Sequence, residues 1–151
     1  MKTKLSLAII VASVFITLAA CSPGSAKVDV EVSHDDFVKV QDTISRNVSK
    51  NIEVSAGSLF TVALWSNPTT GFQWSESAAI SDQDSVRQTG HEFVPPAGMG
   101  DSPPPPGASG KEVWTFKALK KGTTTISMEY SQPWEGGEKD AFGFFLTVVV
   151  K

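Results

Sequence analysis

The last hundred residues contain several short runs in which every second residue is apolar, and this period of two constrains the fold more than any other feature. Such alternation places the apolar side chains on one face of a β-strand. The turn "AGS" at 56–58 and Gly122 interrupt the pattern. The apolar positions are Ile52, Val54, Phe60, Val62, Leu64, Trp114, Phe116, Ile126, Met128, Tyr130, Phe142, Phe144, Leu146, Val148 and Val150.

The alternation predicts an all-β domain, because no segment after the N-terminus shows helical periodicity over ten residues. Strands with one apolar face need a second sheet to cover that face. Six or seven candidate strands favour a β-sandwich, and a small open barrel is the alternative. The 151 residues are enough for one such domain.

The N-terminus has the features of an export signal. Lys2 and Lys4 precede an uncharged, mostly apolar stretch at 5–20, which is short for a membrane span. The sequence "LAAC" at 18–21 resembles the lipobox of bacterial lipoproteins, in which the cysteine is lipidated and becomes the first mature residue. An ordinary cleavage site that happens to precede Cys21 is the alternative.

This resemblance divides the chain into a lipoprotein signal peptide at 1–20, a tether at 21–33 and a folded domain at 34–151. Lipid on Cys21 would anchor an exported bacterial lipoprotein without spanning the membrane. In an organism with two membranes, Ser22 rather than aspartate favours the outer membrane, with the domain facing the periplasm or the surface. Because Cys21 is the only cysteine, the domain is held by packing without disulfides.

Composition argues against catalysis and against nucleic acid as a partner. The only histidines are His34 and His91, and no His/Asp/Glu cluster has metal-ligand spacing. Asp82 and Asp84 lack the glycine and glutamate of a calcium loop. The net charge is −3, and removal of the two signal-peptide lysines makes it −5 (11 basic against 16 acidic residues). We expect no metal, no cofactor and no enzymatic activity.

The segment "NPTTGF" at 67–72 predicts a stiff, uncharged, projecting loop. Pro68 fixes its own φ and Asn67 can turn its side chain onto the following backbone. Gly71 supplies a backbone shape that other residues avoid. Thr69 and Thr70 are then left at the tip, with Phe72 at the base. Taken alone, this segment is more typical of a plain hairpin connection than of a binding loop.

Two further loops give the segment a context. "GASG" at 107–110 precedes the strand at 112–116, and "QPWE" at 132–135 follows the strand that ends at Tyr130. In this order the three loops resemble those of the chagasin family of protein inhibitors of papain-like cysteine peptidases. The likeness covers 51–150. The matching positions are Asn67, Pro68, Thr69, Thr70, Gly71, Phe72, Gly107, Gly110, Pro133 and Trp134, whereas Ser109 replaces a usual glycine and Gln132 replaces arginine.

The resemblance implies an immunoglobulin-like β-sandwich of about seven strands that presents the three loops side by side. Thr69 and Thr70 would enter the cleft of a papain-like cysteine peptidase, and the other two loops would clasp its rims. Inhibition would be reversible occlusion, without cleavage of the inhibitor, by a monomer. Trp134 would be the anchor of the third loop, because a tryptophan beside proline offers a large apolar face.

The role of one segment and the function of the domain each have an alternative interpretation. The proline-rich stretch at 95–110 predicts a long exposed loop, which is either a tolerated insertion or a binding loop. A cell-envelope adhesion or carbohydrate-binding module is the alternative function, with exposed tryptophans as stacking platforms. Trp74 and Trp114 alternate with apolar neighbours, so we expect them to be buried, which weakens that alternative.

Overall fold

The computed structural model describes residues 28–38, 46–97 and 105–151. The predicted signal peptide, its lipobox with Cys21, and the tether up to residue 27 lie outside the described residues. The elements, in chain order, are β1 (Val28–Val32), α1 (His34–Val38), β2 (Asn47–Val54), β3 (Leu59–Ser66), the 3-10 turn η1 (Pro68–Thr70), β4 (Gln73–Trp74), β5 (Ala79–Ile80), β6 (Val86–Val94), β7 (Gly110–Ala118), β8 (Gly122–Ser131) and β9 (Phe142–Val150).

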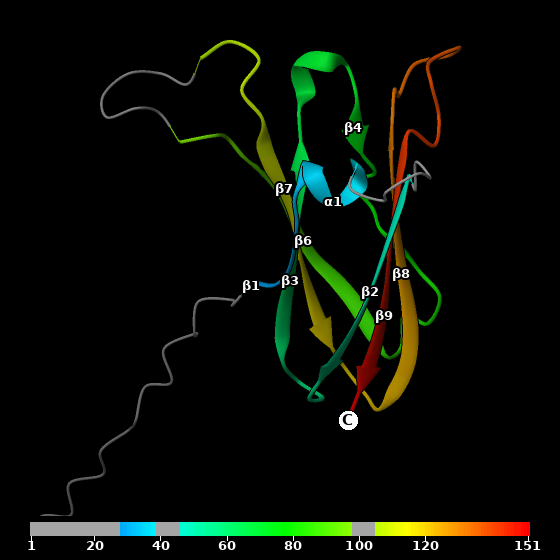
Figure 1. Cartoon of the computed structure of the whole chain (residues 1–151). Coiled ribbons are helices and arrows are strands. Elements are labelled where there is room, and N and C mark those ends of the chain that lie inside the picture. Colours follow the sequence, from blue (N-terminus) through cyan, green and yellow to red (C-terminus); the bar gives the residue numbers. More distant parts are fainter. Residues whose placement is uncertain (1–27, 39–45, 98–104) are drawn as a thin grey trace, which may run out of the picture.

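These strands form two sheets (Figure 1). One sheet has the order β1-β3-β7-β6, and the other has the order β2-β9-β8-β4 with β5 also paired to β8. β1 pairs with β3 and β2 with β9 in parallel, whereas the remaining pairs are antiparallel. Seven strands have five residues or more and two have only two. The predicted two-sheet sandwich of about seven strands is confirmed.

The core lies between the sheets and follows the predicted alternation. The inward positions of β3, β7, β8 and β9 are almost fully buried. Trp74 and Trp114 are both 0% exposed, as their apolar neighbours predicted. The residues that these four strands contribute to the core cluster are Phe60, Val62, Leu64, Trp114, Phe116, Ala118, Ile126, Met128, Tyr130, Phe144, Leu146, Val148 and Val150.

The structure differs from the sequence prediction near the N-terminus. The tether was predicted to extend to residue 33, but β1 is hydrogen-bonded to β3, with Val30 paired to Val62. Val32 is 1% exposed, so the domain begins no later than Val28. The five-residue helix α1 was also not expected, and it buries Phe37 in the core. Such a helix is too short to show periodicity in the sequence.

β6 is the strand that alternation marks least clearly. Its register shifts between Gln88 and Gly90, where β6 pairs with β7, and only Val86 is fully buried. A bulge of this kind breaks the period of two. Among the described residues, no helix is long and apolar enough to cross a membrane.

Candidate functional site

The segment 67–72, which we call the threonine loop, is ordered by its own hydrogen bonds. Asn67 is the N-cap of η1, and its side-chain carbonyl accepts from the Thr69 amide at 3.3 Å. Gly71 ends the turn with φ of 80°, in the left-handed region. A side chain at Gly71 would be strained there. The predicted roles of asparagine and glycine in stiffening this loop are therefore present in the structure.

The two threonine hydroxyls point back into the threonine loop. The Thr69 hydroxyl donates to the Asn67 side-chain oxygen at 2.6 Å, and the Thr70 hydroxyl donates to the Asn67 backbone carbonyl at 2.7 Å. Both threonines are exposed. Because each hydroxyl proton is already donated within the loop, the threonines offer a partner their methyl groups and hydroxyl oxygens that can still accept, on a rigid turn.

Tyr130 supports the base of the threonine loop. Its hydroxyl accepts from the Asn67 amide at 3.0 Å and lies 3.3 Å from the Asn67 carbonyl, to which it can donate. The Phe72 ring stacks on the Tyr130 ring with a centroid separation of 5.5 Å. Since Tyr130 is 2% exposed and Phe72 is half-buried, the loop is attached to the core at both ends.

The three predicted loops lie together at one end of the sandwich (Figure 1). The Asn67 side-chain amide donates to the Gly107 carbonyl at 3.2 Å, which joins the threonine loop to the glycine loop (107–110). On the other side, a Cβ placed on Gly71 would lie 2.6 Å from the Trp134 ring. The threonine loop therefore sits between the glycine loop and the tryptophan loop (132–141).

Trp134 is the exposed aromatic residue of this surface, with 49% of its area accessible. It packs against the backbone of Gly71 while most of its other face remains free. Pro133 precedes it and is exposed. The predicted anchor role of Trp134 stays a prediction; its exposure and its packing on Gly71 suit that role, since such a tryptophan loses little entropy on docking.

Gln132, which stands where arginine was expected, closes the tryptophan loop from within. The Gln132 side-chain carbonyl accepts from the Glu138 backbone amide at 3.0 Å. The Gln132 backbone amide donates to the Glu138 backbone carbonyl at 2.8 Å. The Lys139 ammonium donates to the Trp134 carbonyl at 3.3 Å. The glutamine side chain is thus engaged in the loop's own structure.

The glycine loop differs in part from the expectation. Gly107 has φ of 81° and no neighbour within reach of a Cβ, so its backbone is open to a partner. Gly110, another position that matches the family pattern, is instead buried at the start of β7, and a Cβ there would lie 2.6 Å from the Phe93 ring. Phe93, 42% exposed, occupies that place on the surface, and Ser109 is half-buried.

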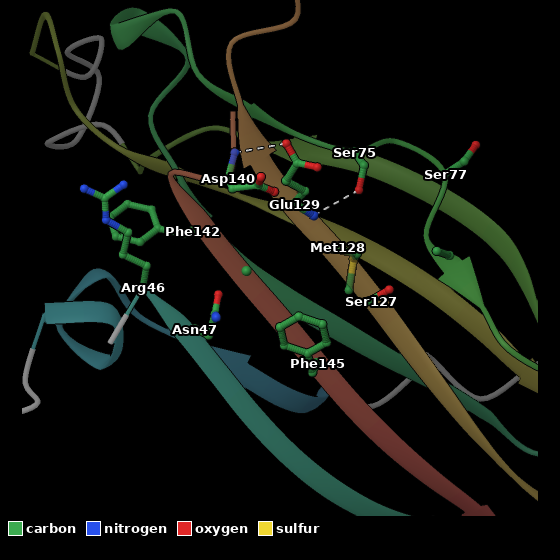
Figure 2. A pocket seen from close by; sticks show the side chains of 12 residues that line it. Arg46, Asn47, Ser75, Ser77, Ser127, Met128, Glu129, Asp140, Phe142 and Phe145 are labelled. Atoms are coloured by element: carbon green, nitrogen blue, oxygen red, sulfur yellow. Dashed lines mark hydrogen bonds between the residues drawn. The ribbon is translucent and has the colours of Figure 1, made fainter. Parts of the chain in front are cut away.

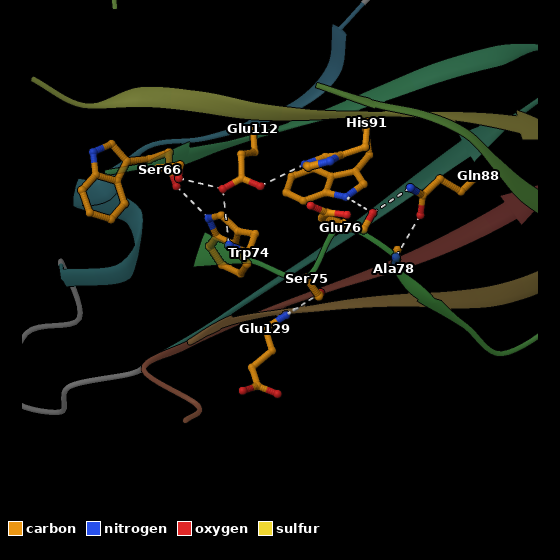
Figure 3. A network of polar contacts seen from close by, with 11 residues as sticks. Ser66, Trp74, Ser75, Glu76, Ala78, Gln88, His91, Glu112 and Glu129 are labelled. Atoms are coloured by element: carbon orange, nitrogen blue, oxygen red, sulfur yellow. Dashed lines mark hydrogen bonds and ion pairs between the residues drawn. The ribbon is translucent and has the colours of Figure 1, made fainter. Parts of the chain in front are cut away.

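Sequence reasoning missed a buried polar network beneath the threonine loop. Glu112 is only 6% exposed and contacts Ser66, Trp74 and His91 (Figure 3). The signal was available: Glu112 falls at an inward position of β7, in step with Trp114, where the alternation calls for an apolar residue. A carboxylate at such a position must be hydrogen-bonded.

Other surfaces give less support to the alternative function. Figure 2 shows a pocket beside β8 and β9 that is lined by Arg46, Glu129, Asp140, Phe145 and three serines but no tryptophan. Trp65 is half-buried, so Trp134 is the one tryptophan in the described residues with a largely open face. Among the same residues there is no group of three potential metal ligands.

Comparison with known proteins agrees with this geometry. Residues 53–148 match the family model described as chagasin family peptidase inhibitor. Amoebiasin-2 of Entamoeba histolytica is 32% identical over 105 residues, which cover 66% of this chain and 76% of that protein. Chagasin of Trypanosoma cruzi is 32% identical over 102 residues, which cover 66% of this chain and 86% of chagasin.

The crystal structure of a cysteine protease inhibitor from Entamoeba histolytica has a similar fold. Its TM-score is 0.57 at 22% identity, over 81% of this chain and 96% of that one. The chain belongs to the chagasin family of peptidase inhibitors. The predictions of an immunoglobulin-like sandwich and of an inhibitor rather than an enzyme are confirmed.

Proposed function

We propose that this chain is a reversible, uncleaved inhibitor of papain-like cysteine peptidases, and that its threonine loop fills the active-site cleft. The observation that carries the proposal is the contiguity of the three loops. Asn67 bonds to Gly107 on one side, and Gly71 packs against Trp134 on the other. One continuous surface is therefore available to span a cleft and both of its rims.

The shape of the threonine loop suits occlusion better than cleavage. A thiol peptidase cleaves an extended peptide whose carbonyl carbon is open to the thiolate. Here the Asn67 carbonyl accepts from the Thr70 amide at 3.2 Å and the Pro68 carbonyl accepts from the Gly71 amide at 3.0 Å. These two bonds hold a 3-10 turn, so the loop does not present the extended backbone that a thiol peptidase cleaves.

Order before binding is the second support for the proposal. A flexible segment would lose about 0.5–1.5 kcal/mol per immobilised side chain on docking. Thr69 and Thr70 are already held by hydrogen bonds, and the Trp134 ring packs on Gly71. Little further ordering is needed, which favours tight binding by a small surface.

The cellular setting is also part of the proposal. The lipobox-like "LAAC" at 18–21 supports a bacterial lipoprotein anchored through Cys21, and Ser22 favours the outer membrane. A segment of a few residues before β1 would let the domain reach a peptidase near the membrane surface. We infer a monomer, because the three loops act from one chain.

Titration of the domain from residue 22 onward against papain tests the inhibitory function. We expect stoichiometric, reversible inhibition and intact inhibitor by mass spectrometry after long incubation. No inhibition of papain-like enzymes at micromolar concentrations would refute the proposed target class. Cleavage that keeps pace with inhibition would instead indicate a slow substrate.

Charged substitutions at the tip test the loop assignment. Thr69→Glu and Thr70→Glu should each weaken inhibition by about a hundredfold or more, since a desolvated charge in the cleft has no partner. Thr123→Glu, at an exposed position of β8, is the matched control. Equal inhibition by all three variants would show that the threonine loop is not inserted.

The proposed lipid anchor on Cys21 is tested separately. Cys21→Ser should abolish fatty-acid labelling and move the full-length protein from the membrane fraction to the soluble fraction. Retention in the membrane fraction without labelling would contradict the lipobox, whatever the outcome of the inhibition assays.

A further inference from the structure

Glu112 is a carboxylate at a buried position between the sheets, where an apolar residue is expected. It occupies an inward position of β7, opposite Leu64 of β3, with Trp114 next to it on the same face. Its side chain is 7% exposed. Burial of a charge without partners would cost several kcal/mol, so its contacts account for its presence.

The contacts of Glu112 converge on the two stems of the threonine loop. One oxygen, Oε1, accepts from the Ser66 hydroxyl at 2.8 Å and from the Trp74 backbone amide at 3.3 Å (Figure 3). Ser66 is the last residue of β3, directly before the loop. Trp74 is the last residue of β4, two residues after it.

These two stems belong to different sheets. β3 lies in the sheet with β7, whereas β4 pairs with β8 in the other sheet. The threonine loop is therefore the crossover between the sheets, and one carboxylate oxygen joins its departure to its return. A second bond, from the Trp74 indole to the Trp65 carbonyl at 2.8 Å, spans the same gap.

His91 fixes the other oxygen of the carboxylate. Its Nε2 lies 2.9 Å from Glu112 Oε2, and its ring packs on Trp114 with centroids 4.8 Å apart. The histidine side chain is 19% exposed. With both oxygens engaged, the Glu112 side chain has a single orientation, and Oε1 is held on the loop stems.

We propose that Glu112 is the positioning residue of the inhibitory surface: it sets the spacing of the threonine-loop stems and thereby the rigidity of the tip. The clamp acts from the interior and does not contact the peptidase. This inference rests on the proposed function for its effect on inhibition. Its effect on loop order can be measured in the free protein.

A pair of near-isosteric substitutions separates hydrogen bonding from packing. Glu112→Gln keeps an acceptor oxygen for Ser66 and Trp74, and its amide group can donate to the other tautomer of His91. Glu112→Leu fills a similar volume without any acceptor. We expect the glutamine variant to resemble the wild type and the leucine variant to release the loop.

The primary readout is hydrogen exchange of the Thr70 and Gly71 amides, followed by NMR. Both amides are bonded within the threonine loop, to Asn67 and Pro68. In the Glu112→Leu variant their exchange should rise about tenfold or more relative to Leu146 in the core. Inhibition of papain should weaken about tenfold to a hundredfold, because the loop must then be ordered on binding.

Thr124→Val is the matched control. Thr124 is 1% exposed and its hydroxyl accepts from the Asp82 amide at 2.9 Å, at the end of the sandwich remote from the loops. This variant should lower global stability and leave loop exchange and inhibition unchanged. If Glu112→Leu behaves in the same way, Glu112 is merely structural and the proposal is overturned.

A milder variant covers the case in which Glu112→Leu does not fold. Ser66→Ala removes one donor and should raise Thr70 and Gly71 exchange by a smaller factor; unchanged exchange would overturn the proposal. Faster loop exchange in a chain whose wild type inhibits no cysteine peptidase would uphold the clamp and refute the proposed function.

Discussion

The two ends of the sandwich both contain buried polar groups that are hydrogen-bonded, but these groups support different structures. The loop end carries the threonine, glycine and tryptophan loops. The turn end carries the connections at 55–58, 81–85 and 119–121, next to the C-terminus (Figure 1). Both ends contain buried hydrogen-bonded groups, Glu112 at one and Thr124 at the other. No buried side-chain polar atom in the described residues lacks a partner.

The two ends differ in the kind of segment that their buried hydrogen bonds hold in place. At the turn end they close connections against the core, as where Thr124 binds the Asp82 amide. At the loop end they hold a projecting element, and the side chains around it stay open, with Trp134 49% exposed. A polar layer under a projecting loop therefore supports the surface that we propose binds the peptidase, while the apolar core between the sheets remains intact.

The largest effect should come from Gly71→Ala. Its φ of 80° disfavours alanine by about 1–2 kcal/mol. The new Cβ would also lie 2.6 Å from the Trp134 ring, so two loops would be displaced together. We expect inhibition of papain to weaken by a factor of about a hundred or more.

Gly57→Ala is the control that separates backbone strain from the contact with the Trp134 ring. Gly57 has φ of 86° at the turn end, and a Cβ there meets no neighbour within 4 Å. Thermal unfolding should show similar destabilisation for both variants, whereas inhibition should be lost only with Gly71→Ala. Equal inhibition by the two proteins would mean that the packing of Trp134 on Gly71 has no functional role.

Trp134→Ala should have the next largest effect. A tryptophan that anchors an interface typically contributes about 2 kcal/mol or more, so its removal corresponds to roughly thirtyfold weaker inhibition. Stability should change little, since half of the side chain is already in solvent. Leu119→Ala, at a position 37% exposed at the turn end, is the control that should leave inhibition unchanged.

The local parts of the loop end could be predicted from the sequence. Pro68 and Gly71 act through their own backbone geometry, so the stiff turn is visible in six consecutive residues. The inward faces of β3, β7, β8 and β9 follow from alternation for the same reason. The large apolar face expected of Trp134 beside Pro133 is also present, since Trp134 is 49% exposed.

The supports of the loop could not be predicted in this way. Tyr130 holds Asn67 across 63 positions of sequence, and Glu112 holds Ser66 across 46. Such pairs depend on strand register and on the facing sheet, which local patterns do not contain. β1 was assigned to the tether for the same reason, since its parallel pairing with β3 needs a partner some thirty residues away.

A smaller effect is expected at Gln132. Gln132→Ala removes the acceptor of the Glu138 amide and leaves the backbone bond between the same residues. Loss of one exposed hydrogen bond is worth about 0.5–1.5 kcal/mol, so inhibition should weaken by about tenfold at most. Gln83→Ala, exposed at the turn end, is the control. A loss as large as that of Trp134→Ala would make loop closure, rather than the indole, the main determinant.

The smallest effect concerns acid stability and should be confined to the turn end. The hydrogen bond from the Ser85 hydroxyl, more than any other contact, lowers the pKa of Asp82, and the Asp84 and Ser85 amides and Lys120 act in the same direction. A carboxyl group whose pKa is lower in the folded state stabilises the protein above its unfolded pKa. That contribution is lost as the pH falls below the usual aspartate range and through the lowered pKa of the folded state.

Removing this group should therefore flatten the acid limb of the stability profile. Urea unfolding of Asp82→Asn at pH 6 and pH 3 should show a smaller difference between the two midpoints than the wild type shows. Ser85→Ala should act in the same direction, because it removes the main cause of the shift. Inhibition at neutral pH should be unchanged in both variants, since neither residue lies near the three loops. An altered inhibition constant would mean that the two ends are coupled through the core and do not act independently.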